Sequence, residues 1–159
     1  MPGLSVLIPV FNRNVTPLVY ALQAQTADWD GPVEILCLDD GSRETERLPN
    51  RRLRELPGVC YEELPHNIGR AAIRNRLASV ARHEWLLLLD NDSLLPDARF
   101  LARYAAARAQ APVLVGGTAY EHTAPDTSEL HLRWLYGRQR EARPAAVRQR
   151  APHGQLTLN

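Results

Sequence analysis

The stretch from Leu4 to Val10, which reads LSVLIPV, is a short apolar run rich in β-branched residues. Such a run is typical of a strand that is buried on both faces of a parallel sheet. Pro9 should fall at the carboxyl end of this strand. Residues 16–25 follow with apolar side chains at helical spacing, and Thr16-Pro17 provides a cap and a first-turn proline. The chain is therefore predicted to begin with a strand, a loop and a helix.

The same cycle of strand and helix recurs along the chain. Further strands are predicted at 33–38, 59–64 and 85–89, and helices at 44–56, 71–82 and 96–110. A fifth strand is predicted at 113–115, ending at Gly116-Gly117. This alternation indicates an α/β fold, in which an open, mostly parallel and twisted sheet has helices on both faces. After Thr118 the pattern decays into a short helix at 128–136 and a partly loop-like run at 137–155.

Polar side chains follow the predicted strands at the points where these strands end. The clusters are Phe11-Asn12-Arg13, Asp39-Asp40, His66-Asn67 and Asp90-Asn91-Asp92. In open parallel sheets, ligands bind at the carboxyl ends of the strands. The sequence therefore predicts that the four clusters form one site.

The overall composition is that of an ordinary globular protein of 159 residues with a formal net charge of +1. This balance gives no general attraction to nucleic acid, which is not an expected partner. Cys37 and Cys60 lack the spacing of a zinc site or a disulfide framework. No apolar stretch approaches the roughly 20 residues that span a bilayer. We therefore expect a cytoplasmic protein without a transmembrane segment.

Asp90-Asn91-Asp92 is the sharpest local signal, because two carboxylates stand one residue apart just after a buried strand. Both can reach a hard divalent cation, and Mg²⁺ or Mn²⁺ prefers such oxygen ligands together with substrate phosphate oxygens. The alternative interpretation is that Asp92-Ser93 caps the next helix.

Asp39-Asp40-Gly41-Ser42 also has two interpretations. Asp40 or Ser42 could cap the following helix, and Asp39 could accept a hydrogen bond from the imide N–H of a base such as uracil. Both interpretations can hold at once.

The segment Asn67-Ile68-Gly69-Arg70, with Arg74 one helical turn later, places N–H groups and guanidinium groups near a helix N-terminus. Phosphate binds well in such surroundings. A solvent-exposed arginine face is the alternative for Arg70 and Arg74. This segment lacks the glycine spacing of a P-loop or of a Rossmann fingerprint, which argues against an ATPase or a dehydrogenase.

Four motifs in this order and spacing resemble those of family 2 glycosyltransferases, which have the GT-A fold. The motifs are SVLIPVFNR at 5–13, LDDGS at 38–42, NIGRAAIRN at 67–75 and LDND at 89–92. The resemblance covers residues 4–118 and continues more weakly through 132–137. Each motif is weak alone, but the four in sequence are specific.

The resemblance implies a role for each matching residue. Pro9 and Phe11 would line the base and ribose, Asp39 would bind the base, and Arg74 would contact the nucleotide or its phosphates. Further contacts with the nucleotide sugar are implied for Asn12, Arg13, Asn67, Gly69, Asp90 and Asn91. Asp92, together with Asp90, would bind Mn²⁺ or Mg²⁺.

The implied activity is the inverting transfer of a sugar from a nucleotide-diphosphate sugar, with a UDP-sugar as the expected donor. The acceptor would be a hydroxyl of a carbohydrate or lipid-linked molecule, and the complete enzyme could associate peripherally with a membrane. In this family the general base comes from a later segment, so no catalytic residue is assigned here. Residues 155–159 look like the lead-in to the strand before that base, which suggests a truncated chain.

Residues 1–120 are accordingly expected to form the nucleotide-sugar-binding domain, and 121–159 to begin an acceptor-side region. Two other functions stay open. The chain could be a non-catalytic nucleotide-binding module. It could also be a sugar-1-phosphate nucleotidyltransferase, although the expected glycine-rich basic loop after the first strand is replaced by residues 11–15, FNRNV.

Overall fold

The computed structural model describes residues 1–150, apart from the side chain of Gln149. The chain forms two compact units, which divide after Ala111. The sequence-based boundary was placed near residue 120. The strand lead-in that was expected at 155–159 lies outside the described residues.

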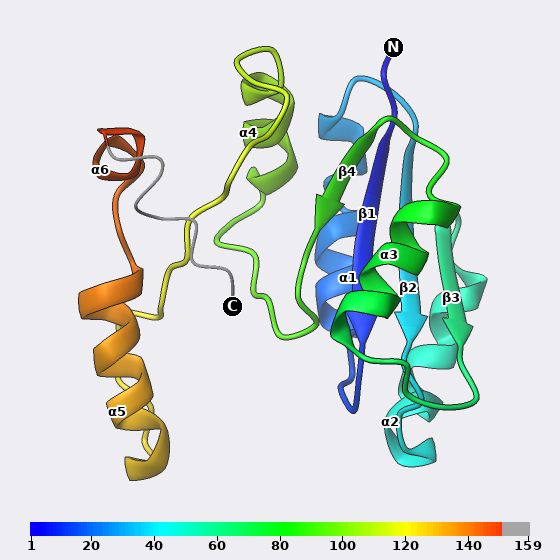
Figure 1. Ribbon diagram of the computed structural model, residues 1–159, viewed down its shortest axis with the longest axis horizontal. Helices are drawn as coiled ribbons and strands as arrows, with labels where there is room; N and C mark the ends of the chain where they lie inside the picture. The colour runs from blue at the N-terminus through cyan, green and yellow to red at the C-terminus, as the bar shows by residue number, and fades with distance from the viewer. Residues whose placement is uncertain (151–159) are drawn as a thin grey trace. The chain divides into compact units, whose positions relative to one another are not determined.

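The first unit is built on a four-stranded parallel sheet with the order β3-β2-β1-β4 (Figure 1). The strands are β1 (Leu4–Val10), β2 (Val33–Asp39), β3 (Val59–Glu63) and β4 (Trp85–Leu88). Val10 is paired with Asp39, so β1 and β2 end at the same level of the sheet. This parallel arrangement confirms the α/β fold class, and it brings the loops that follow the strands to one edge.

The helices of this unit are close to those predicted. They are α1 (Thr16–Gln23), η1 (Thr26–Asp28), α2 (Glu44–Asn50), η2 (Arg51–Glu55), α3 (Arg70–Val80) and α4 (Phe100–Ala107). The single helix predicted at 44–56 is divided into α2 and the 3₁₀ segment η2. Pro49 lies inside α2 and cannot donate a backbone hydrogen bond, which accounts for the early end of the α-helix.

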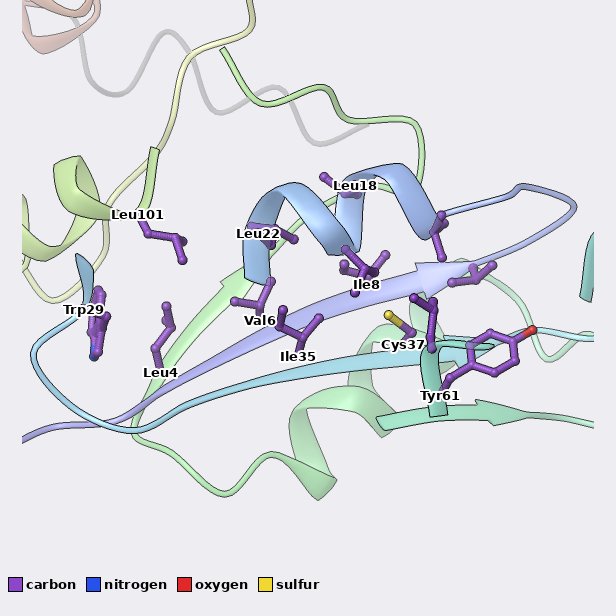
Figure 2. Packing of buried hydrophobic residues seen from close by; sticks show 14 residues of the cluster. Leu4, Val6, Ile8, Leu18, Leu22, Trp29, Ile35, Cys37, Tyr61 and Leu101 are labelled. Carbon is purple, nitrogen blue, oxygen red and sulfur yellow. The ribbon is translucent and has the colours of Figure 1, made fainter. Parts of the chain in front are cut away.

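Helices cover both faces of the sheet, as predicted. Figure 1 shows α1 and α3 on opposite sides of the strands. On the α1 side, Val6 and Ile8 of β1 pack with Leu22 of α1 and Leu101 of α4 (Figure 2). On the α3 side, Leu7 packs with side chains from β2, Leu64 and α3. Since β1 is buried on both faces, its continuous apolar sequence has a physical cause.

The predicted fifth strand is wrong. Residues 113–115 form no strand, and Val113 and Val115 are 76% and 67% exposed. Three residues followed by Gly116-Gly117 offer little side-chain packing to stabilise a strand. Consequently β4 is an edge strand in the described part of the chain, and its residues alternate between half-buried and exposed.

The second unit contains the predicted helix α5 (Ser128–Tyr136), a π-helical turn η3 (Gly137–Glu141) and α6 (Ala145–Arg150). The prediction of a loop-like run after residue 137 is thus partly wrong, because helical turns occupy much of 137–150. Glu141 accepts hydrogen bonds from Tyr120 and Arg133, which tie η3 to α5 and to the preceding loop. None of the helices among residues 1–150 has the length and apolar character that would let it cross a membrane.

A buried carboxylate fastens the start of β4 to the sheet. Glu34, which is 2% exposed, accepts hydrogen bonds from the Ser5 hydroxyl at 2.6 Å and from the backbone and side chain of Arg82 at 2.7 Å. Burial opposes ionisation of Glu34, but these hydrogen bonds outweigh it and lower its pKa below the ordinary value. The ionised carboxylate therefore stabilises the fold.

We expect this carboxylate to make stability depend on acidity. Because the pKa of Glu34 is lower in the folded than in the unfolded chain, its contribution is present above the unfolded value of 4.5 and is lost as the pH falls through the folded value. Urea denaturation should show Glu34→Gln to be about 1–3 kcal/mol less stable near neutral pH. The difference from the natural chain should shrink in acid, and a difference that stayed constant would contradict this explanation.

Candidate functional site

A cleft of about 350 Å³ opens at the carboxyl edge of the sheet. Its walls come from the ends of all four strands and from the start of α3. The lining residues are Pro9, Val10, Phe11, Asp40, Asn67, Arg70, Ile73, Asp90, Asn91 and Asp92. Each of the four polar clusters contributes at least one residue to this list, so the structure brings the four clusters together at one cleft.

The loops after β2 and β3 touch at Gly41. This glycine has a φ of 75°, and a β-carbon added there would lie 2.5 Å from the amide nitrogen of Asn67. A side chain at this position would therefore push the two loops apart, and the positive φ itself disfavours any other residue. The close approach places Asp40 and Asn67 in the same cleft.

Asp40 holds the loop before α3 in place. Its two carboxylate oxygens accept hydrogen bonds from the backbone N–H groups of Ile68 at 2.7 Å and Gly69 at 3.1 Å. Gly69, with a φ of 92°, directly precedes α3 and does not line the cleft. Of the segment that was predicted to bind phosphate, the N–H groups of Ile68 and Gly69 are thus already bonded to Asp40.

Asp39 does not lie where the sequence analysis placed it. The side chain is fully buried, outside the cleft lining, and its Oδ1 accepts the Ser42 N–H at 2.7 Å. Arg47 forms an ion pair with Oδ1 at 3.4 Å, and the Tyr61 hydroxyl donates to Oδ2 at 3.1 Å. Burial, followed by the charge of Asp39, raises the pKa of Tyr61, so the phenol remains a donor. Asp39 therefore supports the turn, and Asp40 faces the cleft.

Asn12 and Arg13 are also outside the cleft lining. Asn12 has a φ of 49°, its N–H donates to the Ser42 hydroxyl at 2.8 Å, and its side-chain oxygen accepts the Arg43 N–H at 3.0 Å. It joins the loops after β1 and β2. The side chain of Arg13 is exposed and forms no hydrogen bond or ion pair among residues 1–150. Direct contacts predicted for these two residues are not supported by their positions.

The apolar wall of the cleft comes from the end of β1. Pro9, Val10 and Phe11 lie along it, and Phe11 is 48% exposed. Asn91 donates from its side-chain amide to the backbone oxygen of Phe11 at 3.2 Å, which joins the loop after β4 to this wall. An exposed aromatic ring beside an amide offers a flat surface on which a planar ring can stack.

The charged wall comes from α3 and the loop after β4. Arg70 lines the cleft and approaches one oxygen of Asp90 at 3.4 Å. Arg74 lies outside the cleft lining and forms a hydrogen-bonded ion pair with the other oxygen of Asp90. Asp92 is exposed, and no group among residues 1–150 forms a hydrogen bond or ion pair with its carboxylate. Asp90 and Asp92 thus have different surroundings, although they stand one residue apart.

These residues fit a divalent cation in part. No group of three histidine, cysteine or acidic side chains that could hold a metal occurs in the described part of the chain. The unpartnered carboxylate of Asp92 and the neighbouring Asp90 form a donor set of two, and both line the cleft. Mg²⁺ and Mn²⁺ often use one or two carboxylates and take their remaining ligands from substrate phosphates and water.

Within the predicted cluster Asp39-Asp40, the ligand contact was expected from Asp39 and not from Asp40. No site role was predicted for Ile73, and Arg70 had two interpretations. Alternation along β2 gave no signal for Asp40, because both faces of this strand are buried. Asp39 shares a face with Ile35 and Cys37, and Asp40 follows on from the face of Leu36 and Leu38. No local signal separated Arg70 from an exposed surface arginine.

Comparison with known proteins gives the same fold. A mannosyltransferase from Pyrobaculum calidifontis, in complex with GDP-Man and Mn²⁺, superposes with a TM-score of 0.55 at 24% identity over 68% of this chain and 32% of its own. TarS 1-349 from S. aureus gives 0.56 at 23% identity over 84% of this chain and 44% of its own. The complex of TarS 1-349 with UDP-GlcNAc gives 0.53 at 25% identity over 68% and 31%.

The chain thus spans between 31% and 44% of the length of these relatives. No curated protein matches it. The model of the family described as glycosyl transferase family 2 matches residues 5–156, nearly the whole sequence. The four motifs, the parallel sheet and this match agree, and the chain belongs to glycosyl transferase family 2.

Proposed function

We propose that the cleft binds the nucleotide diphosphate of a sugar donor, and that the chain is the donor-binding portion of an inverting glycosyltransferase. One observation carries the proposal: an apolar wall, the guanidinium group of Arg70 and the carboxylates of Asp90 and Asp92 line one cleft where four parallel strands end, and a second guanidinium group, that of Arg74, is paired with Asp90. A nucleoside, a diphosphate and a divalent cation each require one of these three features. The GDP-Man and Mn²⁺ in one similar structure and the UDP-GlcNAc in another support this assignment.

The base and ribose would lie along Pro9 and Phe11, with the ring of Phe11 stacking on the base. Asp40 would receive a hydrogen bond from the base, because each of its oxygens retains a lone pair beyond the bonds to Ile68 and Gly69. Uracil, whose imide N–H is such a donor, fits a UDP-sugar. This role replaces the one predicted from the sequence for Asp39. Both side chains are buried, but Asp40 lines the cleft and Asp39 does not.

The diphosphate would lie at the charged wall. Arg70 and Arg74 would donate to phosphate oxygens, since planar guanidinium groups match them well. Asp90 and Asp92 would hold Mn²⁺ or Mg²⁺. When bound, the cation would neutralise charge on the departing diphosphate.

Transfer also needs an acceptor and a base. We propose a carbohydrate or lipid-linked hydroxyl that attacks the anomeric carbon after losing its proton, with inversion as the consequence. Within residues 1–150, the cleft is lined by three carboxylates, Asp40, Asp90 and Asp92. Since each has a role in donor binding, none is assigned as the base.

The absence of an assigned base keeps one alternative open, a module that binds the donor without transferring the sugar. Release of UDP from UDP-GlcNAc, followed with and without carbohydrate acceptors, separates the two functions. A transferase should release UDP faster with an acceptor. A binding module should bind UDP-GlcNAc in calorimetry and release no UDP, and a chain that binds no nucleotide would refute both.

A further inference from the structure

The carboxylate of Asp90 engages the same two arginines that face the phosphates in the proposed function. Arg74 bonds to one of its oxygens, and Arg70 lies 3.4 Å from the other. The side chains are partly exposed, at 48% for Asp90 and 32% for Arg74. A diphosphate could therefore reach and replace the carboxylate, because the partners are not sealed from solvent.

Two groups without a protein partner among residues 1–150 accompany this ion pair. The Nε of Arg74 is buried and has no hydrogen-bond acceptor in the described part of the chain. The carboxylate of Asp92 has no partner there either, although it lines the same cleft as Asp90. An unpaired buried donor is costly, so the arrangement around Arg74 is incomplete without a further acceptor.

We propose that Asp90 takes the place of the diphosphate when no ligand is bound. Its carboxylate pairs with Arg70 and Arg74 until the diphosphate and the cation arrive together. A cation that binds Asp90 withdraws the carboxylate from the two arginines, and these then become available to phosphate oxygens. A diphosphate that takes the arginines likewise frees Asp90 for the cation. Each ligand thus strengthens the other through an exchange of partners at Asp90, in addition to any direct contact between them.

This inference rests on the proposed function, since it assumes that the anion at the arginines is the donor's diphosphate. It predicts that Asp90 and Asp92 affect diphosphate binding differently when no cation is bound. Without a cation, Asp90 competes with the diphosphate for Arg74, whereas Asp92 contributes only its negative charge. Removing the two charges separately should therefore have unequal effects.

The test is calorimetric titration of Asp90→Asn and Asp92→Asn with pyrophosphate and with UDP, in EDTA. We expect Asp90→Asn to bind both ligands about tenfold more tightly than the natural chain, within the usual range of coupling between sites. Asp92→Asn removes the same charge from the same loop and should gain about threefold or less. Equal gains for both variants would overturn the proposal, since simple repulsion would explain them.

Two further measurements exclude a nonspecific effect. In an Arg74→Gln background, the gain from Asp90→Asn should fall to the level of the Asp92→Asn control. The guanidinium group of Arg74 is then absent, and only the longer contact of Asp90 with Arg70, at 3.4 Å, is left to be released. With Mn²⁺ present, Asp90→Asn should instead weaken UDP binding, because Asp90 is then a cation ligand. An undiminished gain in the Arg74→Gln background would also overturn the proposal.

Failure of this proposal and failure of the proposed function give different results. If UDP binds the natural chain with Mn²⁺ but Asp90→Asn shows no gain in EDTA, the exchange at Asp90 is wrong and the nucleotide site stands. If pyrophosphate shows the predicted gain but no nucleotide binds, the exchange stands and the nucleotide function is wrong. If neither ligand binds any variant, both are wrong.

Discussion

Replacing Asp92 with alanine is expected to weaken UDP binding in the presence of Mn²⁺ by about a hundredfold or more. Its carboxylate has no partner among residues 1–150, so it is the group in the cleft that is free to bind a cation. Loss of a group that only supports a metal ligand already costs about 10–100-fold in metal affinity, and loss of a ligand itself should cost at least as much. Calorimetric titration of UDP with Mn²⁺ measures the effect.

Asp28 provides the matched control. It is an exposed aspartate in η1, outside the cleft lining, so Asp28→Ala removes the same charge without touching the site. UDP affinity should be unchanged in this variant. Affinity that is independent of Mn²⁺ and insensitive to Asp92→Ala would count against the cation site.

Asp39→Ala is expected to have the largest effect on stability, lowering the free energy of unfolding by about 3 kcal/mol or more. The substitution leaves Arg47 without its buried partner and the Ser42 N–H without an acceptor. It also removes the acceptor of the Tyr61 hydroxyl. Urea denaturation monitored by circular dichroism measures the loss.

Asp39→Asn is the accompanying control, because an amide oxygen can still accept the hydrogen bond from Ser42. It should lose less stability than Asp39→Ala. If Asp39→Ala proved as stable as the natural chain and lost UDP binding instead, the buried position of Asp39 would be wrong, and the direct base contact of the sequence analysis would be restored. Asp40→Ala should lose UDP affinity, and it should also lose stability, because the N–H groups of Ile68 and Gly69 lose their acceptor.

Much of the fold could be predicted from the sequence because its strands are buried by helices on both sides. Leu4–Val10 reads as an uninterrupted apolar run since it lies at the centre of the sheet, between β2 and β4. The edge strand β4 was also found, although two of its side chains are exposed. Once parallel strands were identified, the convergence of their loops followed from topology alone.

The features that the sequence did not predict depend on the direction of a side chain or on contacts between residues far apart in the chain. Asp39 and Asp40 are neighbours of the same type, and both faces of β2 are buried, so the alternation along this strand does not show which of the two lines the cleft. The single helix predicted at 44–56 contains Pro49, and the structure divides it soon after this residue. The pairing of Arg70 and Arg74 with Asp90 joins residues 16 and 20 positions apart, which no local pattern reveals.

The most direct test of the central claim is a crystal structure of the chain grown with UDP and Mn²⁺, with anomalous diffraction recorded to locate the ion. We predict an anomalous peak bonded to the carboxylate of Asp92, the diphosphate between this ion and Arg70 and Arg74, and the base along Phe11. A peak and nucleotide bound elsewhere, with this cleft left empty, would contradict the account.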